Sequence, residues 1–286
     1  MRPLSPGVLI VVLGLGCTPA APPPPAPSPP LQRGAVVRVA VVVGGVTRQI
    51  ADGKPIALHH GEVLGAADII RTGDGTATLE IGGVADVEIA AHTEASIGEL
   101  SDTLAKVHLT DGRIAAVVHG GDHNTLQIDS LGAVAHTSLG EFSMLSGGSQ
   151  VSVAAVRGQV TLSAKGRSVR IGSGQLSVVT RDQAPTPPAA IPPSLFLKLG
   201  ATRPTTQSER QAVLRGTTAP GAVISINGVR VNADAHGEFT ATMPLKAGPN
   251  RLTVDSADTI GRHAHAEWPR ITVEERAAQV HSKVRW

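Results

Sequence analysis

The sequence predicts an all-β chain with two β domains. Residues 76–81 alternate between polar and apolar side chains, and this period of two is typical of a half-buried strand. Glycine-containing turns separate similar runs at short spacing between residues 44 and 174, which is the pattern of a β meander. A proline-rich segment, residues 182–194, divides this region from a second strand-rich region and predicts a linker there.

Composition narrows the class of function. The 286 residues suffice for two domains. The 25 basic and 23 acidic side chains nearly balance, no run of like charges occurs, and there is no tyrosine, so a nucleic-acid surface is not expected. The single cysteine, Cys17, excludes an intramolecular disulfide. The only aromatic residues are Phe142, Phe196, Phe239, Trp268 and Trp286.

Residues 1–17 predict an export signal. Gly7–Gly16 is an apolar run that is too short to cross a bilayer core, which needs about 20 residues, but fits the apolar part of a signal peptide. Cys17 follows Gly16 directly, in the manner of the lipobox at which bacterial lipoproteins are cleaved and acylated. A plain secretory signal is the alternative. Residues 18–33, rich in proline, favour an extended stalk.

Residues 34–181 predict the first domain. Val36–Val43 is nearly continuous in apolar residues, so we expect a strand that is buried on both faces. Residues 107–115 and 153–162 look alike, and each predicts a strand, a glycine turn and a return strand. Further strands are expected near residues 104–109, 113–118, 125–128, 132–137, 141–145, 150–156, 159–163, 168–171 and 175–179.

This region resembles the FecR domain of bacterial envelope proteins. The resemblance is carried, in order, by Gly61–Leu64, Ile70–Gly73, Leu109–Ile114, Val156–Val160 and Val169–Gln175. It implies a two-layer or short solenoid-like β domain, with Arg71, Thr72 and Gly73 as the motif turn. Regulators of this family pass a signal from an outer-membrane transporter to a sigma factor, through a cytoplasmic segment and one transmembrane helix. Neither is recognised here, so we expect a sensing or protein-interaction module without direct sigma-factor regulation.

Residues 195–273 predict a second, smaller β domain. Asn227-Gly228 between two short apolar runs is a strong hairpin signal. Together with Gly216–Gly221, Gly237–Phe239 and Gly248–Asn250, it resembles the bacterial Ig-like β-sandwich that occurs as an accessory module in glucodextranase-type glycosidases and in surface proteins. Residues 274–286 predict a tail that is either a short helix or disordered.

No motif predicts chemistry. A G-x-S-x-G elbow is absent, and the glycine-rich turns do not precede helices, so neither an enzyme nor a bound cofactor is expected. The histidine groups His59-His60, His119 with Asp122 and His123, and His263 with His265 lack a third ligand at a known spacing, so no metal site is predicted.

We therefore expect a non-enzymatic protein that is lipid-anchored at Cys17 in the bacterial cell envelope and faces the periplasm or the cell surface. Its partner is expected to be an envelope protein. The alternative is a carbohydrate- or cell-wall-binding protein that contacts polysaccharide through Trp268 or Trp286. Trp268 is also expected to lie in the core of the second domain, and a purely structural spacer is a third interpretation.

Overall fold

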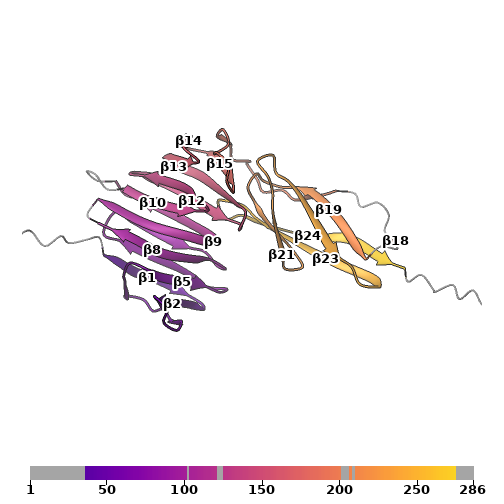
Figure 1. Cartoon of the computed structure of the whole chain (residues 1–286), viewed down its shortest axis with the longest axis horizontal. Coiled ribbons are helices and arrows are strands. Elements are labelled where there is room, and N and C mark those ends of the chain that lie inside the picture. Colours follow the sequence, from indigo (N-terminus) through magenta and orange to yellow (C-terminus); the bar gives the residue numbers. More distant parts are fainter. Residues whose placement is uncertain (1–35, 102, 121–124, 201–205, 208–209, 275–286) are drawn as a thin grey trace, which may run out of the picture. The chain divides into compact units, whose positions relative to one another are not determined.

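All regular elements in the part of the protein that the structure describes are β-strands, as the sequence predicts. The computed structural model describes residues 36–101, 103–120, 125–200, 206–207 and 210–274, and it has no helix within these ranges (Figure 1). Accordingly, no helix in these ranges is long and apolar enough to cross a membrane. Residues 32–286 form one compact unit, and both β domains belong to it.

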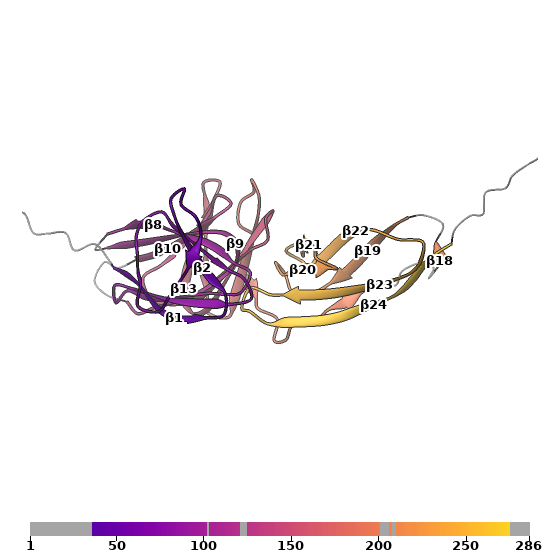
Figure 2. The same cartoon turned by 90° about the horizontal axis from the view of Figure 1, so that it is seen from below.

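The first domain is built from two packed layers of strands. In the first layer the order is β4-β1-β6-β7-β9-β12-β13-β15-β16, and in the second it is β3-β2-β5-β8-β9-β10-β11-β13-β14. Figure 2 shows the layers from a second side, with β8 and β10 in one and β1 in the other. The first-layer strands are β1 (Val37–Val43), β4 (Val63–Leu64), β6 (Thr76–Ile81), β7 (Ala85–Ile89), β9 (Leu104–Val118), β12 (Gly140–Ser146), β13 (Gln150–Ala164), β15 (Gln175–Thr180) and β16 (Ala189–Ala190). The second layer adds β2 (Val46–Ile50), β3 (Ile56–Ala57), β5 (Asp68–Thr72), β8 (Glu94–Leu100), β10 (Thr125–Ser130), β11 (Ala133–Thr137) and β14 (Arg167–Gly172).

Two long strands, β9 and β13, belong to both layers. Residues of β9 before Gly112 pair with β8 and β10, whereas Gly112 and the residues after it pair with β7 and β12. In the same way β13 leaves the first layer after Gly158. The strands β9, β12, β13, β11 and β10 therefore close into a small barrel, and apolar side chains from both layers fill the space between them.

The two hairpins predicted for residues 107–115 and 153–162 are wrong, because each segment is one continuous strand. Gly112 has φ +93° and Gly158 has φ +77°, a backbone region that is open to glycine and strained for other residues. Such a glycine can reverse a chain or only bend it. Here each glycine bends the strand from one layer into the other. The bend is favoured over a reversal because different strands pair with the segments before and after the glycine.

The doubly buried strands are not the ones that the sequence predicts. Val41 and Val43 of β1 are 48% and 59% exposed, so the expectation of burial on both faces is wrong for residues 36–43. The first half of β13 and most of β15 are buried on both faces instead. The apolar pattern of β1 could not reveal this, because the cover on β13 and β15 comes from residues distant in the sequence.

The second domain is a small sandwich of two sheets. A three-stranded sheet has the order β17-β19-β22, and a five-stranded sheet has the order β18-β24-β23-β20-β21. The hairpin at Asn227-Gly228 joins β20 to β21, as predicted. Strand bounds are β17 (Lys198–Leu199), β18 (Thr206–Gln207), β19 (Gln211–Thr217), β20 (Val223–Ile226), β21 (Val229–Asn232), β22 (Glu238–Pro244), β23 (Gly248–Ala257) and β24 (His263–Val273).

The segment expected to be a linker, residues 182–194, is fixed against β15. Thr186 N–H donates to the Val178 carbonyl at 2.9 Å, and Ile191 N–H donates to the Gly174 carbonyl at 2.8 Å. Strand β16 extends the first layer in the same segment. Proline keeps this chain out of a long ladder, but does not leave it detached.

Replacement of Gly112 by alanine tests the role of the layer-crossing point. A Cβ at residue 112 would lie 2.3 Å from Thr93 Oγ1 and 2.6 Å from Thr93 Cα, whereas a Cβ at Gly132, with φ +78°, meets nothing within 4 Å. We expect Gly132→Ala to lower the free energy of unfolding by about 1–2 kcal/mol from backbone strain alone. Gly112→Ala should lower it by about 3 kcal/mol or more, because Thr93 must also move. Urea denaturation measures both, and equal losses would contradict the crossing role.

Candidate functional site

Buried polar side chains join the two β domains. Ser152 of β13 is fully buried, and its Oγ donates to the Gly221 carbonyl at 3.1 Å while lying 2.7 Å from Thr259 Oγ1. Gln150 Nε2 donates to the Ala233 carbonyl at 2.7 Å. A buried hydrogen-bonding group costs free energy when it loses its partner, so these bonds hold the second domain in one position on the first layer.

Further hydrogen bonds, an ion pair and apolar contacts extend this junction. Asn232 Nδ2 donates to the Gly147 carbonyl at 3.1 Å and to Ser149 Oγ at 2.8 Å, and Arg230 forms an ion pair with Asp111. A small apolar cluster seals the other side, with members drawn from β13, β15, the linker and the second domain: Ala154, Leu176, Val178, Ile191, Ala235 and Ile260.

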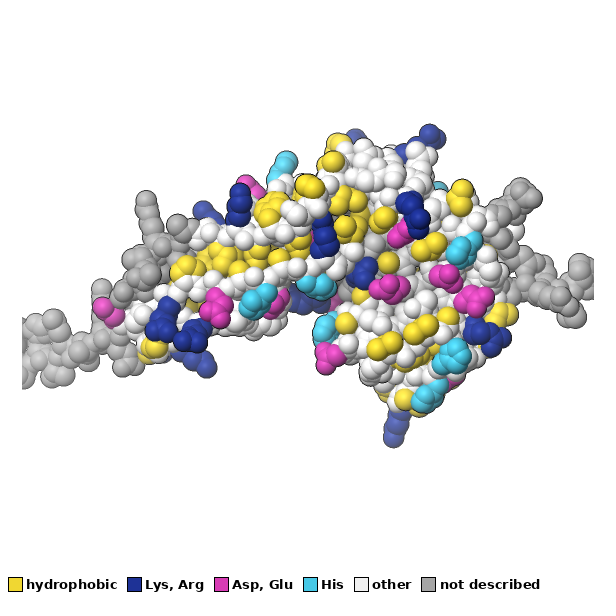
Figure 3. All heavy atoms as spheres, turned by 180° about the vertical axis from the view of Figure 1, so that it is seen from behind, with side chains coloured by type: hydrophobic (Ala, Val, Ile, Leu, Met, Phe, Trp, Pro, Cys, Tyr) yellow, Lys and Arg dark blue, Asp and Glu magenta, His cyan; other side chains and the backbone are white. Residues whose placement is uncertain are grey.

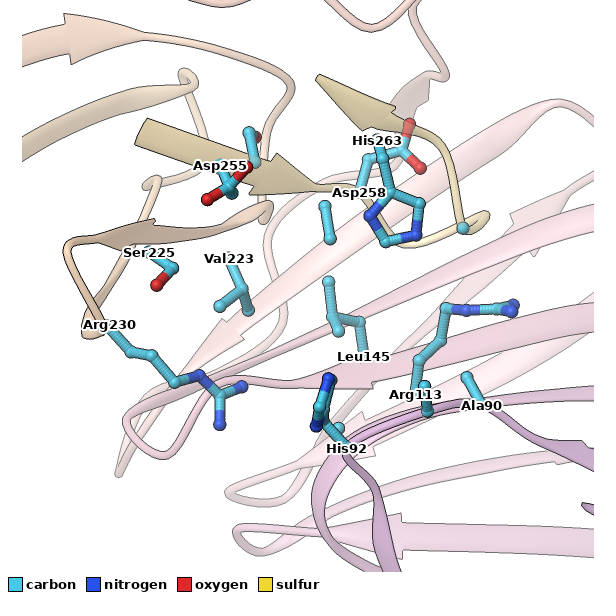
Figure 4. A pocket seen from close by; sticks show the side chains of 16 residues that line it. Ala90, His92, Arg113, Leu145, Val223, Ser225, Arg230, Asp255, Asp258 and His263 are labelled. Atoms are coloured by element: carbon cyan, nitrogen blue, oxygen red, sulfur yellow. The ribbon is translucent and has the colours of Figure 1, made fainter. Parts of the chain in front are cut away.

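Beside this junction lies a pocket of about 460 Å³ (Figure 4). Its apolar surface comes from both domains and consists largely of small side chains, with Leu145 and Val223 near the centre of the view. Ligand pockets in proteins are commonly concave, largely apolar and placed between domains, with volumes of about 300–1,000 Å³. The lining residues are Ala90, Ala91, His92, Gly112, Arg113, Leu145, Val223, Ser225, Gly228, Arg230, Asp255, Ser256, Ala257, Asp258, Gly261 and His263.

Charged groups of both signs surround the pocket, and most have a fixed partner. Arg113 Nη2 lies 3.0 Å from Glu88 Oε1, and Asp258 Oδ2 accepts a hydrogen bond of 2.6 Å from Arg262. Asp255 is bonded to His265 at 2.7 Å. Arg113 Nη1 also donates to Ser143 Oγ at 3.5 Å, so both ends of its guanidinium have a partner within the protein.

Two polar side chains on the pocket wall have no hydrogen-bond partner among the described residues. These are the Ser225 hydroxyl and the His263 ring, and Figure 4 shows both beside the apolar centre. A hydroxyl and an imidazole can each donate or accept. The pocket therefore combines an apolar centre with a few free polar groups, which suits the binding of a short amphipathic group.

The motif residues Thr72 and Gly73 shape one wall of the pocket. Thr72 Oγ1 donates to the Ala90 carbonyl at 2.6 Å and accepts from Thr93 N–H at 2.8 Å. The Gly73 carbonyl accepts from His92 N–H at 2.8 Å. Ala90 and His92 line the pocket, so the motif turn acts on the pocket through the loop that it holds.

Arg71 has a separate structural role on the second layer. Its Nε donates to Glu94 Oε2 at 2.7 Å and its Nη1 to Gln49 Oε1 at 2.5 Å. Strand β5 thus bonds side chains of both neighbouring strands, β2 and β8. Arg71 does not line the pocket.

The remaining predicted site residues lie elsewhere. Trp268 is 3% exposed in the core of the second domain, where little of its ring is open to a ligand. Cys17 and Trp286 lie outside the described residues, so their predicted roles stay predictions.

Several histidines are bonded to single neighbours. His60 Nδ1 lies 2.8 Å from the Ala40 carbonyl, and His119 Nε2 lies 3.1 Å from Asp86 Oδ2. Within the described part of the chain, no group of three potential metal ligands is found, and Asp122 and His123 lie outside that part. In the space-filling view, acidic, basic and histidine side chains are interspersed on the visible face (Figure 3).

Sequence reasoning missed the pocket because it is assembled from distant segments. Two of its pieces did carry a signal: Gly112 and Arg113 belong to the FecR-like motif at Leu109–Ile114, and Gly228 belongs to the predicted hairpin. The signal indicated turns and strands. It could not indicate that these turns meet across two domains.

Comparisons with known proteins give a structural resemblance only. No family model and no curated protein matches the sequence. Two crystal structures of candidate anti-sigma factors from Parabacteroides distasonis resemble the chain. The first has 12% sequence identity and a TM-score of 0.38, and the match covers 43% of this chain and 59% of the other. The second has 15% identity and a TM-score of 0.34, and the match covers 51% of this chain and 60% of the other. The chain thus spans about three fifths of their length. A polysaccharide lyase aligns at 9% identity and TM-score 0.21, covering 85% of this chain and 40% of the lyase.

Removal of the Thr72 hydroxyl tests whether the motif holds the pocket wall. Thr72→Val keeps the shape of the side chain but leaves the Thr93 N–H without its bond, so we expect the free energy of unfolding to fall by about 2 kcal/mol. Thr78→Val on β6, the next strand along the chain, where no side-chain bond is lost, should change it by less than about 0.5 kcal/mol. Urea denaturation gives both values, and equal effects would contradict a holding role for Thr72.

Proposed function

We propose that this protein is a non-enzymatic interaction module of the FecR-domain type, anchored in the bacterial cell envelope through a lipid on Cys17. It receives a short segment of an envelope protein in the pocket between its two β domains. The pocket itself is the observation that carries the proposal. It has an apolar centre, free polar groups on its wall and bonded charges of both signs around it.

The composition of the pocket favours a protein segment over a sugar. Leu145, Val223 and Ala257 offer aliphatic surface for one or two apolar side chains, while Ser225 and His263 can bond a peptide group. Sugar rings are usually held by stacking on aromatic rings, and none of the residues that line this pocket is phenylalanine or tryptophan. Trp268, proposed for such stacking, is buried.

Site-specific photo-cross-linking in intact cells tests this function. A benzophenone side chain at Ser225 should join the protein to one envelope protein, because Ser225 lines the pocket. The same group at Thr240, exposed on β22 of the other sheet, is the matched control and should give at most a tenth of that adduct. Ala257→Phe, which fills the pocket, should remove the Ser225 adduct.

Three results would contradict the proposal: equal adducts at both positions, an adduct that persists after Ala257→Phe, or no adduct at Ser225. Metabolic lipid labelling of the wild type and Cys17→Ala tests the anchor separately, since the pocket does not depend on it.

A further inference from the structure

Charge is distributed unevenly along the first domain. Residues 62–141 contain thirteen acidic and three basic side chains, whereas residues 142–181 contain five basic side chains and no acidic one. Because successive strands lie side by side in the two layers, these five basic residues lie at the end of the domain that contains β13, β14 and β15. In Figure 3 basic side chains project from the upper end of this domain, where Figure 1 places β14.

Strand β14 ends the second layer and has one open edge. It pairs with β13 on one side, and no described strand pairs with the other side. Open edges commonly attract another strand, because their N–H and C=O groups lack partners. The side chains of Arg167, Ser168 and Arg170 are exposed along it.

The register shows which backbone groups are open. Lys165 and Gly166, with φ +48° and +72°, form the two-residue turn between β13 and β14, and Ala164 is opposite Arg167. Residues that flank a two-residue turn exchange backbone hydrogen bonds, and bonded and non-bonded pairs then alternate. The N–H and C=O groups of Ser168 and Arg170 therefore point away from β13.

Two arginines on this strand have no ion-pair partner among the described residues. Arg167 and Arg170 form no salt bridge there, in contrast to Lys165, which lies 2.7 Å from Asp182 Oδ1. That hydrogen bond from Lys165 lowers the pKa of the Asp182 carboxyl. A second copy of β14 would bring four arginines together, so the edge disfavours its own kind and suits an acidic strand.

We propose that the open edge of β14 is a docking site for an extended, acidic segment of another protein, which adds a strand to the second layer. Ser168 and Arg170 supply the backbone hydrogen bonds, and Arg167 and Arg170 supply the charge complementarity. This site is separate from the pocket, because none of these residues lines it.

Fluorescence anisotropy with the full chain tests the site. The probes are two labelled seven-residue peptides of alternating β-branched and charged residues, one with glutamate and one with lysine at the charged positions. We expect the glutamate peptide to bind at least tenfold more tightly than the lysine peptide. Ser168→Pro removes one outward N–H and no backbone bond to β13, so it should weaken the glutamate peptide at least tenfold. It also removes the 2.7 Å bond between Ser168 Oγ and Ser163 Oγ of β13, and Ser168→Ala, which loses only that bond, is the matched control.

A charge-reversal pair supplies a second, independent variant. Arg167→Glu with Arg170→Glu should also weaken the glutamate peptide at least tenfold, whereas Arg215→Glu with Arg251→Glu, on exposed positions of the second domain, should change its affinity less than twofold. Hydrogen exchange should slow at Ser168 and Arg170 when the glutamate peptide binds.

Either of two outcomes would overturn the proposal. If charge reversal weakens binding but Ser168→Pro does not, and exchange does not slow, the attraction is non-specific. If the glutamate peptide does not bind and charge reversal makes the chain self-associate, the arginines only guard the edge.

Discussion

The fold depends on two strands, β9 and β13, that each belong to both layers of the first domain. Because each crosses at a glycine with positive φ, five strands close into a barrel with a single filled core. The crossing at Gly112 also brings other turns together, since Thr93 Oγ1 accepts a bond from Arg113 N–H and Thr72 bonds the loop before Thr93. The positions of the turns that form one wall of the pocket therefore depend on where β9 crosses between the layers. Packing of the core fixes that crossing.

The junction between the two domains places the second domain beside these turns, and the pocket lies between them. Ser152 and Gln150 donate hydrogen bonds to backbone carbonyls of the second domain. Each such bond contributes about 0.5–1.5 kcal/mol to stability. The larger effect is specificity, because any other placement would leave buried donors unpaired. The second domain covers the outer face of β13 and β15, so the first half of β13 and most of β15 are buried on both faces. The same cover leaves a hollow beside Leu145 and Val223, where the two surfaces do not meet.

Much of the fold follows from local patterns, while the site does not. Alternation and turn residues predict the all-β class, most strands between residues 76 and 179, and the hairpin at Asn227-Gly228. The sequence does not predict strands at residues 46–50 and 94–100, because their polar side chains hide the period of two. The pattern at Gly112 and Gly158 fits a hairpin as well as a crossing between layers. The neighbouring strands that favour the crossing include segments distant in the sequence, so the local pattern cannot distinguish the two. Ala90, Ser225 and His263 carry no signal of a pocket, since it exists only where two domains meet.

The distance between the two domains tests the fixed junction most directly. In a Cys17→Ser background, spin labels on cysteines at Glu80 and Thr240, both exposed, report this distance by double electron–electron resonance. A fixed junction predicts one narrow distance distribution in this labelled protein when Gly221 is unchanged. It also predicts a broad one after Gly221→Val, because a Cβ at residue 221 would lie 2.5 Å from Ser152 Cβ. A broad distribution before that substitution would contradict the junction, and with it the pocket.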